Sequence, residues 1–458
     1  MAELIKKSLI CALLILTTTL AVAQEDEDRE PPPRAYGPVV EQSDRLLEPP
    51  ANLPNRDEFV IARTPPTITF STMTGLPELT DKKRLGGLWT VWGEGVWASN
   101  GKCYVGVGDH RAENAKTYLY EYDPKTHEHR IVLDVWDYLG LRPGDWGHGK
   151  IHGRMDELPN GEIIFATYWG GHPDHLPPEE KLKIGGVLLG YNIHSGEVAD
   201  YGIPYPGDSF PMHATDVRRG IFHGYGLGEA YLAYDLNQRK VLYAGKFPDD
   251  FSWSIRVTMI DPVTGICYGG EFNTRRIAGY NPKTNQFFHT KAQVPQHPYL
   301  DQEEKPWIRS YTRQRLDDGS LFAQSREGVM FKFFPDEERV EFVGINWHEG
   351  LYSTSVAMSS DKRFVYYTVG GHGSTWEVGS PVIQLDLHTY QKKVLAFLHP
   401  YFQEKHGYVC GGSYSVNIDE KGENLLITWN GRFREAKETG ESFGHPSFMH
   451  VTIPASER

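Results

Sequence analysis

Residues 89–108 read WTVWGEGVWASNGKCYVGVG, and residues 150–169 read KIHGRMDELPNGEIIFATYW. In each stretch a strand-like run leads into a turn, and an aromatic and β-branched run follows. The pairs Asn100-Gly101 and Asn160-Gly161 supply the positive φ of a tight hairpin turn. Each stretch therefore predicts two antiparallel strands.

Five later segments repeat this pattern, so seven turns are expected. They fall 43 to 60 residues apart, at Gly101, Gly161, Gly220, Gly265, Gly319, Lys362 and Gly422. Each interval is long enough for a four-stranded blade with variable loops. Because helical periodicity is nearly missing, we predict an all-β fold, a seven-bladed β-propeller over residues 59–458. Seven similar repeats disfavour the alternative, a two-sheet sandwich.

The seventh copy lacks a fourth strand, because SFMHVTIPASER (447–458) closes the sequence. The segment TPPTITFST (64–72) lies before the first copy and could supply that strand. We therefore predict a propeller closed by an N-terminal strand, which removes the open sheet edge.

The first residues resemble an export signal. Lys6 and Lys7 precede an apolar stretch, and Ala21-Val22-Ala23 fits a cleavage site. We predict a signal peptide at 1–23, cut after Ala23, and a secreted or periplasmic, monomeric protein. Residues 24–58 begin charged and Pro-rich, and we predict a disordered linker there. No later stretch is long and apolar enough for a membrane span.

The net charge of −13 argues against a nucleic-acid partner. An anionic polysaccharide would be repelled at long range as well, so it would need a local cationic groove. Removing residues 1–23 leaves Cys103, Cys267 and Cys410, an odd number. Cys103 and Cys267 each follow a turn glycine by two residues, in blades on opposite sides of the ring, so we predict that they form no disulfide.

Blades usually place their first strand along the central channel. Counting nine residues back from each turn selects Trp92, His152, Pro211, Arg256, Ser310, Ser353 and Ser413. His152 and Arg256 stand out because they place a titratable base and a fixed cation at matched depth. The structural alternative for His152 is a histidine that is buried and hydrogen-bonded in the blade core, and that for Arg256 is an ion pair between blades. Trp92 is either a sugar-stacking platform or a core residue.

Several imidazoles and phenols are expected on one rim of the channel. His172 follows the second strand of its blade, after Tyr168 and Trp169. Its alternative interpretation is an exposed loop histidine. Comparable places in blades 1 and 6 hold His110 and His372, and blade 3 offers His213, His223 and Tyr225.

These residues resemble a known group, the seven-bladed propeller polysaccharide lyases, and most of all the ulvan lyases. The resemblance depends on KIH ending at His152, on the NG and IIFAT that follow, on His172, and on Arg256 entering a later blade. The closing WNGR and ESFGHPSFMHVTIPASER are also similar to the ends of such chains.

The resemblance implies β-elimination at a uronic acid of an anionic polysaccharide or oligosaccharide. It implies catalytic roles for His152, His172, Arg256 and Tyr243, with Tyr225 and Tyr311 as rival tyrosines. Arg256 would neutralise the carboxylate, His152 or a tyrosinate would take the C5 proton, and His172 would protonate O4. We expect substrate contacts from Trp92, Trp169, His213, Tyr225, Tyr311 and His372. This chemistry requires no cofactor.

Other classes stay open. The same residues could bind carbohydrate without turnover. A metal-dependent enzyme similar to the oligogalacturonate lyases would need a histidine cluster that the sequence does not show. A lactonase-like propeller would need acidic or Asn ligands on the axis, and the seven axial positions include none. His406 and Cys410 could begin a structural metal site, for Zn or Ca, although two ligands are too few.

Overall fold

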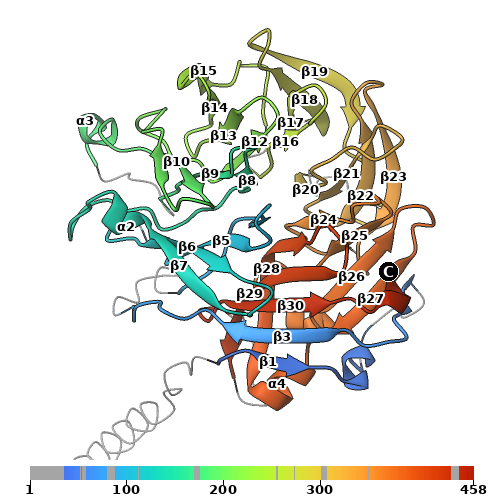
Figure 1. Ribbon diagram of the computed structural model, residues 1–458. Helices are drawn as coiled ribbons and strands as arrows, with labels where there is room; N and C mark the ends of the chain where they lie inside the picture. The colour runs from blue at the N-terminus through green and yellow to red at the C-terminus, as the bar shows by residue number, and fades with distance from the viewer. Residues whose placement is uncertain are drawn as a thin grey trace, which may run out of the picture. The chain divides into compact units, whose positions relative to one another are not determined.

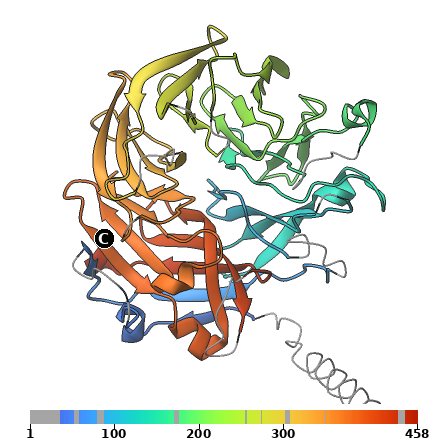
Figure 2. The same cartoon turned by 180° about the vertical axis from the view of Figure 1, so that it is seen from behind.

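The computed structural model describes residues 36–51, 53, 58–79, 88–111, 113–169, 176–253, 256–272, 274–300, 307–348, 350–434 and 443–458. Seven small antiparallel sheets stand in a ring, so the fold is the predicted seven-bladed β-propeller (Figure 1). Figure 2 shows the same ring from behind.

The first three blades follow the chain in simple order. Blade 1 contains β4 (Val96–Trp97), β5 (Cys103–Gly108), β6 (Thr117–Tyr122) and β7 (His129–Asp134). Blade 2 contains β8 (Asp156–Glu157), β9 (Glu162–Ala166), β10 (Leu188–Asn192) and β11 (Val198–Asp200). Blade 3 contains β12 (Met212–Asp216), β13 (Ile221–Tyr225), β14 (Ala230–Asp235) and β15 (Lys240–Lys246).

The next three blades repeat this order. Blade 4 contains β16 (Met259–Ile260), β17 (Cys267–Gly270), β18 (Arg276–Asn281) and β19 (Gln286–Gln293). Blade 5 contains β20 (Ile308–Tyr311), β21 (Leu321–Ser325), β22 (Val329–Phe334) and β23 (Arg339–Ile345). Blade 6 contains β24 (Val356–Met358), β25 (Phe364–Tyr367), β26 (Pro381–Asp386) and β27 (Lys392–Phe397), with β2 (Val60–Ile61) parallel to β27.

Blade 7 joins the two ends of the propeller. Its strands are β28 (Tyr408–Ile418), β29 (Asn424–Phe433), β30 (Ser447–Thr452), β3 (Thr67–Thr72) and β1 (Val39–Glu41). Strand β3 pairs antiparallel with β30, from Thr67 opposite Thr452 to Thr72 opposite Ser447. The predicted closure by segment 64–72 is therefore confirmed (Figure 1).

Helices are few and short among the described residues. They are η1 (Asp44–Leu47), α2 (Val135–Tyr138), α3 (Pro178–Lys181), η3 (Thr375–Val378), α4 (Tyr401–His406) and η4 (Ala455–Glu457). None of them is long enough to cross a membrane.

The seven predicted turn positions all have positive φ, from 59° at Lys362 to 84° at Gly319. Two glycines near the axis have a different role, because the inner strands of adjacent blades approach closely there. A Cβ on Gly153 would lie 2.3 Å from Nδ1 of His213, and one on Gly93 would lie 2.6 Å from the carbonyl oxygen of Ile151. This close approach holds His152 and Trp92 beside the channel.

The hydrophobic core lies between the blades. Blades 1 and 2 share a cluster that includes Tyr104 and Phe165, and blades 5 and 6 share one that includes Phe322 and Tyr367. Cys103, Cys267 and Cys410 are all buried and free, as the blade positions of Cys103 and Cys267 predict.

Part of the segment expected to be a linker belongs to the propeller. Residues Gly37–Arg458 form one compact unit, and within it β1 pairs with β3. The carboxylate of Glu41 accepts hydrogen bonds from Tyr401 and Lys405 of α4. Val39, Val40 and a fully buried Leu46 supply apolar surface that a disordered linker lacks. The predicted signal peptide lies outside the described residues.

Candidate functional site

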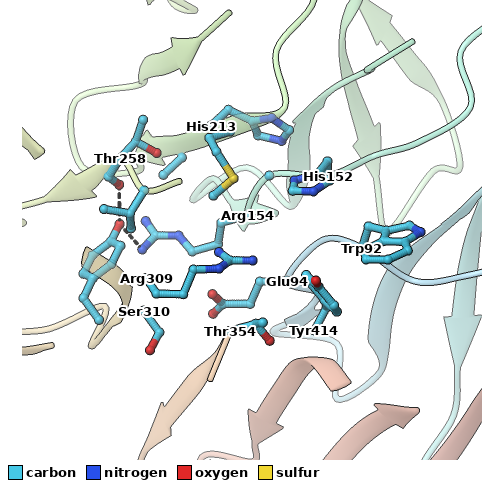
Figure 3. Close-up of a pocket in the computed structure, with 15 residues that line it drawn as sticks. Trp92, Glu94, His152, Arg154, His213, Thr258, Arg309, Ser310, Thr354 and Tyr414 are labelled. Carbon is cyan, nitrogen blue, oxygen red and sulfur yellow. Dashed lines mark hydrogen bonds between the residues drawn. The ribbon is translucent and has the colours of Figure 1, made fainter. Parts of the chain in front are cut away.

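A pocket lies on the propeller axis, where the inner strands of the blades meet (Figure 3). Its lining residues are Trp92, Glu94, His152, Gly153, Arg154, Met212, His213, Ala214, Val257, Thr258, Arg309, Ser310, Tyr311, Thr354 and Tyr414. Three of the predicted axial positions, Trp92, His152 and Ser310, are in this set. Pro211 and Arg256 each precede a lining residue directly.

His152 lines this pocket with only 6% of its surface exposed. We call the part of the pocket that Trp92, His152 and Tyr414 line together its mouth. Its ring meets those of Tyr168 and Tyr414 edge-on, with ring centroids 5.8 Å and 6.4 Å away. Burial lowers the pKa of His152 well below its usual value, and the charges of Lys150, Arg256 and Arg309 lower it further. The imidazole is therefore neutral at pH 7 and can accept a proton.

Three cations lie around His152: Lys150, Arg256 and Arg309. Among the described residues, no carboxylate forms an ion pair with Lys150, Arg256 or Arg309. Lys150 and Arg309 are buried, and the Lys150 Nζ lies 4.5 Å from the Trp92 ring centroid. Burial, together with the charge of Arg256, lowers the pKa of Lys150. Buried cations are normally paired, so this arrangement favours an anionic ligand.

Two phenols lie beside Arg309. Its Nε donates to the Tyr352 hydroxyl at 2.5 Å, and its guanidinium carbon lies 5.0 Å from the Tyr352 ring centroid and 5.6 Å from that of Tyr414. The Tyr414 hydroxyl lies 3.4 Å from Nδ1 of His372. Burial raises the pKa of Tyr414 well above its usual value, although Arg309 and Arg256 oppose the rise. Tyr414 therefore holds its proton at pH 7.

Aromatic rings form one wall of the mouth. Trp92 stacks on Phe443 with ring centroids 5.7 Å apart and meets Tyr414 edge-on at 4.8 Å. Trp92 is only partly buried, so it is not an ordinary core residue. The stacked Phe443 ring and the Lys150 ammonium over the indole both cover part of the Trp92 surface.

An ion network crosses the channel below the mouth. Arg313 of blade 5 reaches Glu94 at 3.0 Å and Asp156 at 2.9 Å, and it also donates to the carbonyl oxygen of Gly95. Asp156 in turn pairs with Arg154 at 2.9 Å, and Arg154 donates to the Tyr311 hydroxyl. Arg154 and Arg313 are thus paired with carboxylates, whereas the part of the chain that the structure describes holds no carboxylate partner for the cations of the mouth. Glu94 is an acidic residue near the axis that the nine-residue count did not select.

Several predicted contact residues are buried below or beside the mouth. His213 lines the pocket, and burial lowers its pKa to about 4. Tyr311 also lines the pocket, and its hydroxyl donates to the carbonyl oxygen of Thr258 at 2.8 Å. Trp169 is 1% exposed and packs against Trp146. Of the predicted contacts, Trp92 and His372 lie at the mouth with their surfaces partly open.

The structure does not bring Tyr243 to His152. Tyr243 lies on β15, the outermost strand of blade 3, where its hydroxyl donates to the carbonyl oxygen of Lys246. Tyr225 is buried, and its hydroxyl donates to the carbonyl oxygen of Trp253 at 3.2 Å. The predicted His172 lies outside the described residues.

The predicted metal ligands have other surroundings. His406 ends α4 and contacts the Glu41 carboxylate at 2.8 Å. Cys410 is buried on β28, and burial raises the pKa of its thiol well above the usual value. Across the described ranges, no three His, Cys, Asp or Glu side chains gather as metal ligands.

Counting nine residues back from each turn did not select four residues of this site: Lys150, Arg309, Tyr352 and Tyr414. In blades 5 and 7 the register of the inner strand shifts, between Ile308 and Ser310 and again between Gly412 and Ser415. Arg309 and Tyr414 are the immediate neighbours of the predicted Ser310 and Ser413. Such β-bulges redirect side chains by one position. Lys150 could have been predicted, because it lies two residues before His152 and alternate residues of an extended chain point to the same side.

Comparison with known proteins adds little beyond the fold. No family model matches this chain, and no curated protein matches it. One similar solved structure is titled "Structure of U3-55K", with a TM-score of 0.44 and 8% identity over 80% of this chain and 98% of that chain. Nothing about the function of this chain follows from a likeness of that degree.

Proposed function

We propose that this protein is a polysaccharide lyase that cleaves a uronate-containing glycan by β-elimination. One observation carries the proposal: a neutral, buried His152 meets a protonated tyrosine edge-on and lies among three cations that have no acidic partner in the described ranges. The sequence resemblance to ulvan lyases supports the same chemistry. The predicted export signal is consistent with a substrate outside the cell.

The cations would recognise the uronate carboxylate. A C5 proton is a poor acid while the adjacent carboxylate is charged, because its removal adds a second negative charge. Arg256, Arg309 and Lys150 supply positive charge at the mouth, and guanidinium groups match a carboxylate in two-point geometry. They would also stabilise the enolate-like charge that develops in the transition state.

His152 would act as the general base. It takes the proton from C5, and the electrons of that bond form the C4–C5 double bond. Because burial and the neighbouring cations keep the ring neutral, the base is available well into the acidic range. A bound carboxylate would partly cancel the cations and make the imidazole a stronger base.

Tyr414 would act as the general acid. When the C4–O4 bond breaks, its hydroxyl gives a proton to the departing O4, so no charged alkoxide leaves. The tyrosinate that forms lies beside Arg309, 5.6 Å from the ring centroid to the guanidinium carbon, and Arg256 also favours its charge. The tyrosine then recovers its proton from His152 through solvent.

The test is a substrate panel followed by ultraviolet absorbance of the unsaturated uronate product. Purified protein is incubated with ulvan, polygalacturonate, alginate and glucuronan. We expect absorbance to rise with at least one of them, and to stay flat with His152→Ala. Retarded migration in a gel containing one polymer, with no absorbance change for any of them, would instead identify a carbohydrate-binding propeller.

A further inference from the structure

A second cation and aromatic group lies beside the mouth, at the channel ends of blades 4 and 5. The guanidinium carbon of Arg326 lies 5.0 Å from the Trp307 ring centroid. Phe272 meets the Trp307 ring edge-on, with centroids 4.9 Å apart. The Arg326 amide donates to the Trp307 carbonyl oxygen at 2.8 Å, so the backbone fixes the two residues together.

This group adjoins the candidate catalytic residues. Trp307 precedes Arg309 by two residues, which places their Cα atoms within about 7 Å of each other. Burial lowers the pKa of His372 to about 4, and the charges of Arg309, Arg256, Arg326 and Lys150 lower it further. The four cations therefore act on one side chain at the mouth. Trp92 and Phe443 belong to blades 1 and 7, so the two aromatic groups come from different sides of the ring.

Arg326 is available to a ligand. Its residue surface is exposed, and Trp307 and Phe272 are partly exposed. No carboxylate in the described part of the chain pairs with Arg326. A guanidinium stacked on an aromatic ring keeps its in-plane N–H donors free for an oxyanion. Stacking on Trp307 also reduces the rotamer freedom that binding would otherwise remove.

We infer that Arg326, Trp307 and Phe272 form a separate subsite for an acidic sugar unit, which carries a carboxylate or a sulfate ester. The inference rests on the proposed function, because its occupant is a further unit of the chain that is cleaved between His152 and Tyr414. The polymer then crosses the mouth from the Trp92 wall toward Trp307. The subsite contributes affinity and leaves the chemical step unchanged.

The experiment compares Arg326→Ala with Arg339→Ala. Arg339 is the matched control, because its guanidinium carbon lies 3.6 Å from the Phe334 ring centroid on the same blade and it pairs with Glu337. Both variants are assayed on ulvan and polygalacturonate, and on the shortest oligosaccharides that the wild-type protein cleaves. For Arg326→Ala we expect KM on the polymer to rise about three- to tenfold, with kcat unchanged. KM for the shortest oligosaccharides should stay the same, and Arg339→Ala should match the wild type throughout.

A binding measurement keeps this subsite distinct from the catalytic proposal. In a His152→Ala background, the Kd for ulvan by calorimetry should rise by the same factor when Arg326→Ala is added, and Arg326→Lys should restore part of the affinity. If the wild-type protein cleaves a polymer but Arg326→Ala changes neither KM nor Kd, the subsite is wrong and the lyase proposal stands. If no polymer is cleaved but Arg326→Ala weakens binding, the lyase proposal is wrong and the subsite stands. An equal change in KM for long and short substrates would also contradict the subsite.

Discussion

The ring of His152 meets the ring of Tyr414 edge-on at the mouth of the channel, with centroids 6.4 Å apart and planes inclined by 66°. The two residues come from blades 2 and 7, and Trp92 of blade 1 lies against Tyr414. A base and an acid on the two blades that flank blade 1 can address the two bonds that a β-elimination breaks. The cations of blades 2, 4 and 5 lie beside both.

The first prediction concerns the base and the acid. His152→Ala and Tyr414→Phe should each lower kcat by about 10²–10⁴, the usual contribution of one general acid or base. Steady-state kinetics would measure this, with thermal melting to show that both variants fold. His388→Ala is the control, because His388 is exposed on an outer turn. A loss below tenfold in both variants would remove these roles.

The second prediction concerns pH. The neutral form of His152 is the active base, so activity is lost as pH falls through its pKa. Lys150 helps to lower that pKa, and removing its charge should raise it. Lys150→Met should therefore move the acidic limb of kcat/KM to higher pH. Lys102→Met is the control, because Lys102 pairs with Glu121 on the turn of blade 1. An acidic limb that stays in place would contradict the charge coupling.

The third prediction concerns the floor of the channel. Arg313→Ala removes the partner of Glu94 and one partner of Asp156, and should cost about 2–3 kcal/mol of unfolding free energy. Because burial already raises the pKa of Glu94, adding Glu94→Gln should recover part of that loss. Arg363→Ala breaks a more exposed pair with Asp386 and should cost under about 1 kcal/mol. Urea unfolding would compare them, and equal losses for Arg313 and Arg363 would contradict the network.

The fourth prediction concerns acid stability. Burial lowers the pKa of seven described histidines to about 3 or about 4, namely His110, His148, His213, His223, His372, His445 and His450. The unfolded chain takes up protons near the ordinary histidine value, and the folded chain does so only at lower pH. Stability should therefore fall as pH drops from about 6.5 toward 4, by up to ~1.4 kcal/mol per pH unit for each histidine. Unfolding free energies that agree at pH 7 and pH 5 would contradict this.

Much of the fold could be predicted from the sequence, because the conformation of a tight turn depends on the residues within it. The positive φ at Gly101, Gly161 and Lys362 follows from residues within the turns themselves. The closing strand could be predicted because a blade without a fourth strand leaves an open edge. The attachment of Glu41 to α4 could not, since its partners Tyr401 and Lys405 lie about 360 residues away.

The residues of the candidate site could be predicted only in part from the sequence, for a physical reason. Counting from the turns assumes regular strands, and that assumption holds well enough to find Trp92 and His152. Bulges in blades 5 and 7 shift the register. Arg309 therefore lines the pocket beside the predicted Ser310, and Tyr414 lines it in place of the predicted Ser413. The catalytic role predicted for Tyr243 depended on the family resemblance alone, and the structure places this residue on an outer strand.

The most direct test of the central claim is the fate of water in the reaction. The protein is incubated with the polymer it degrades in water labelled with heavy oxygen, and the products are analysed by mass spectrometry. Elimination predicts unsaturated products without label, since no water enters the cleaved bond. Saturated products that carry the heavy oxygen would show hydrolysis and contradict the lyase proposal.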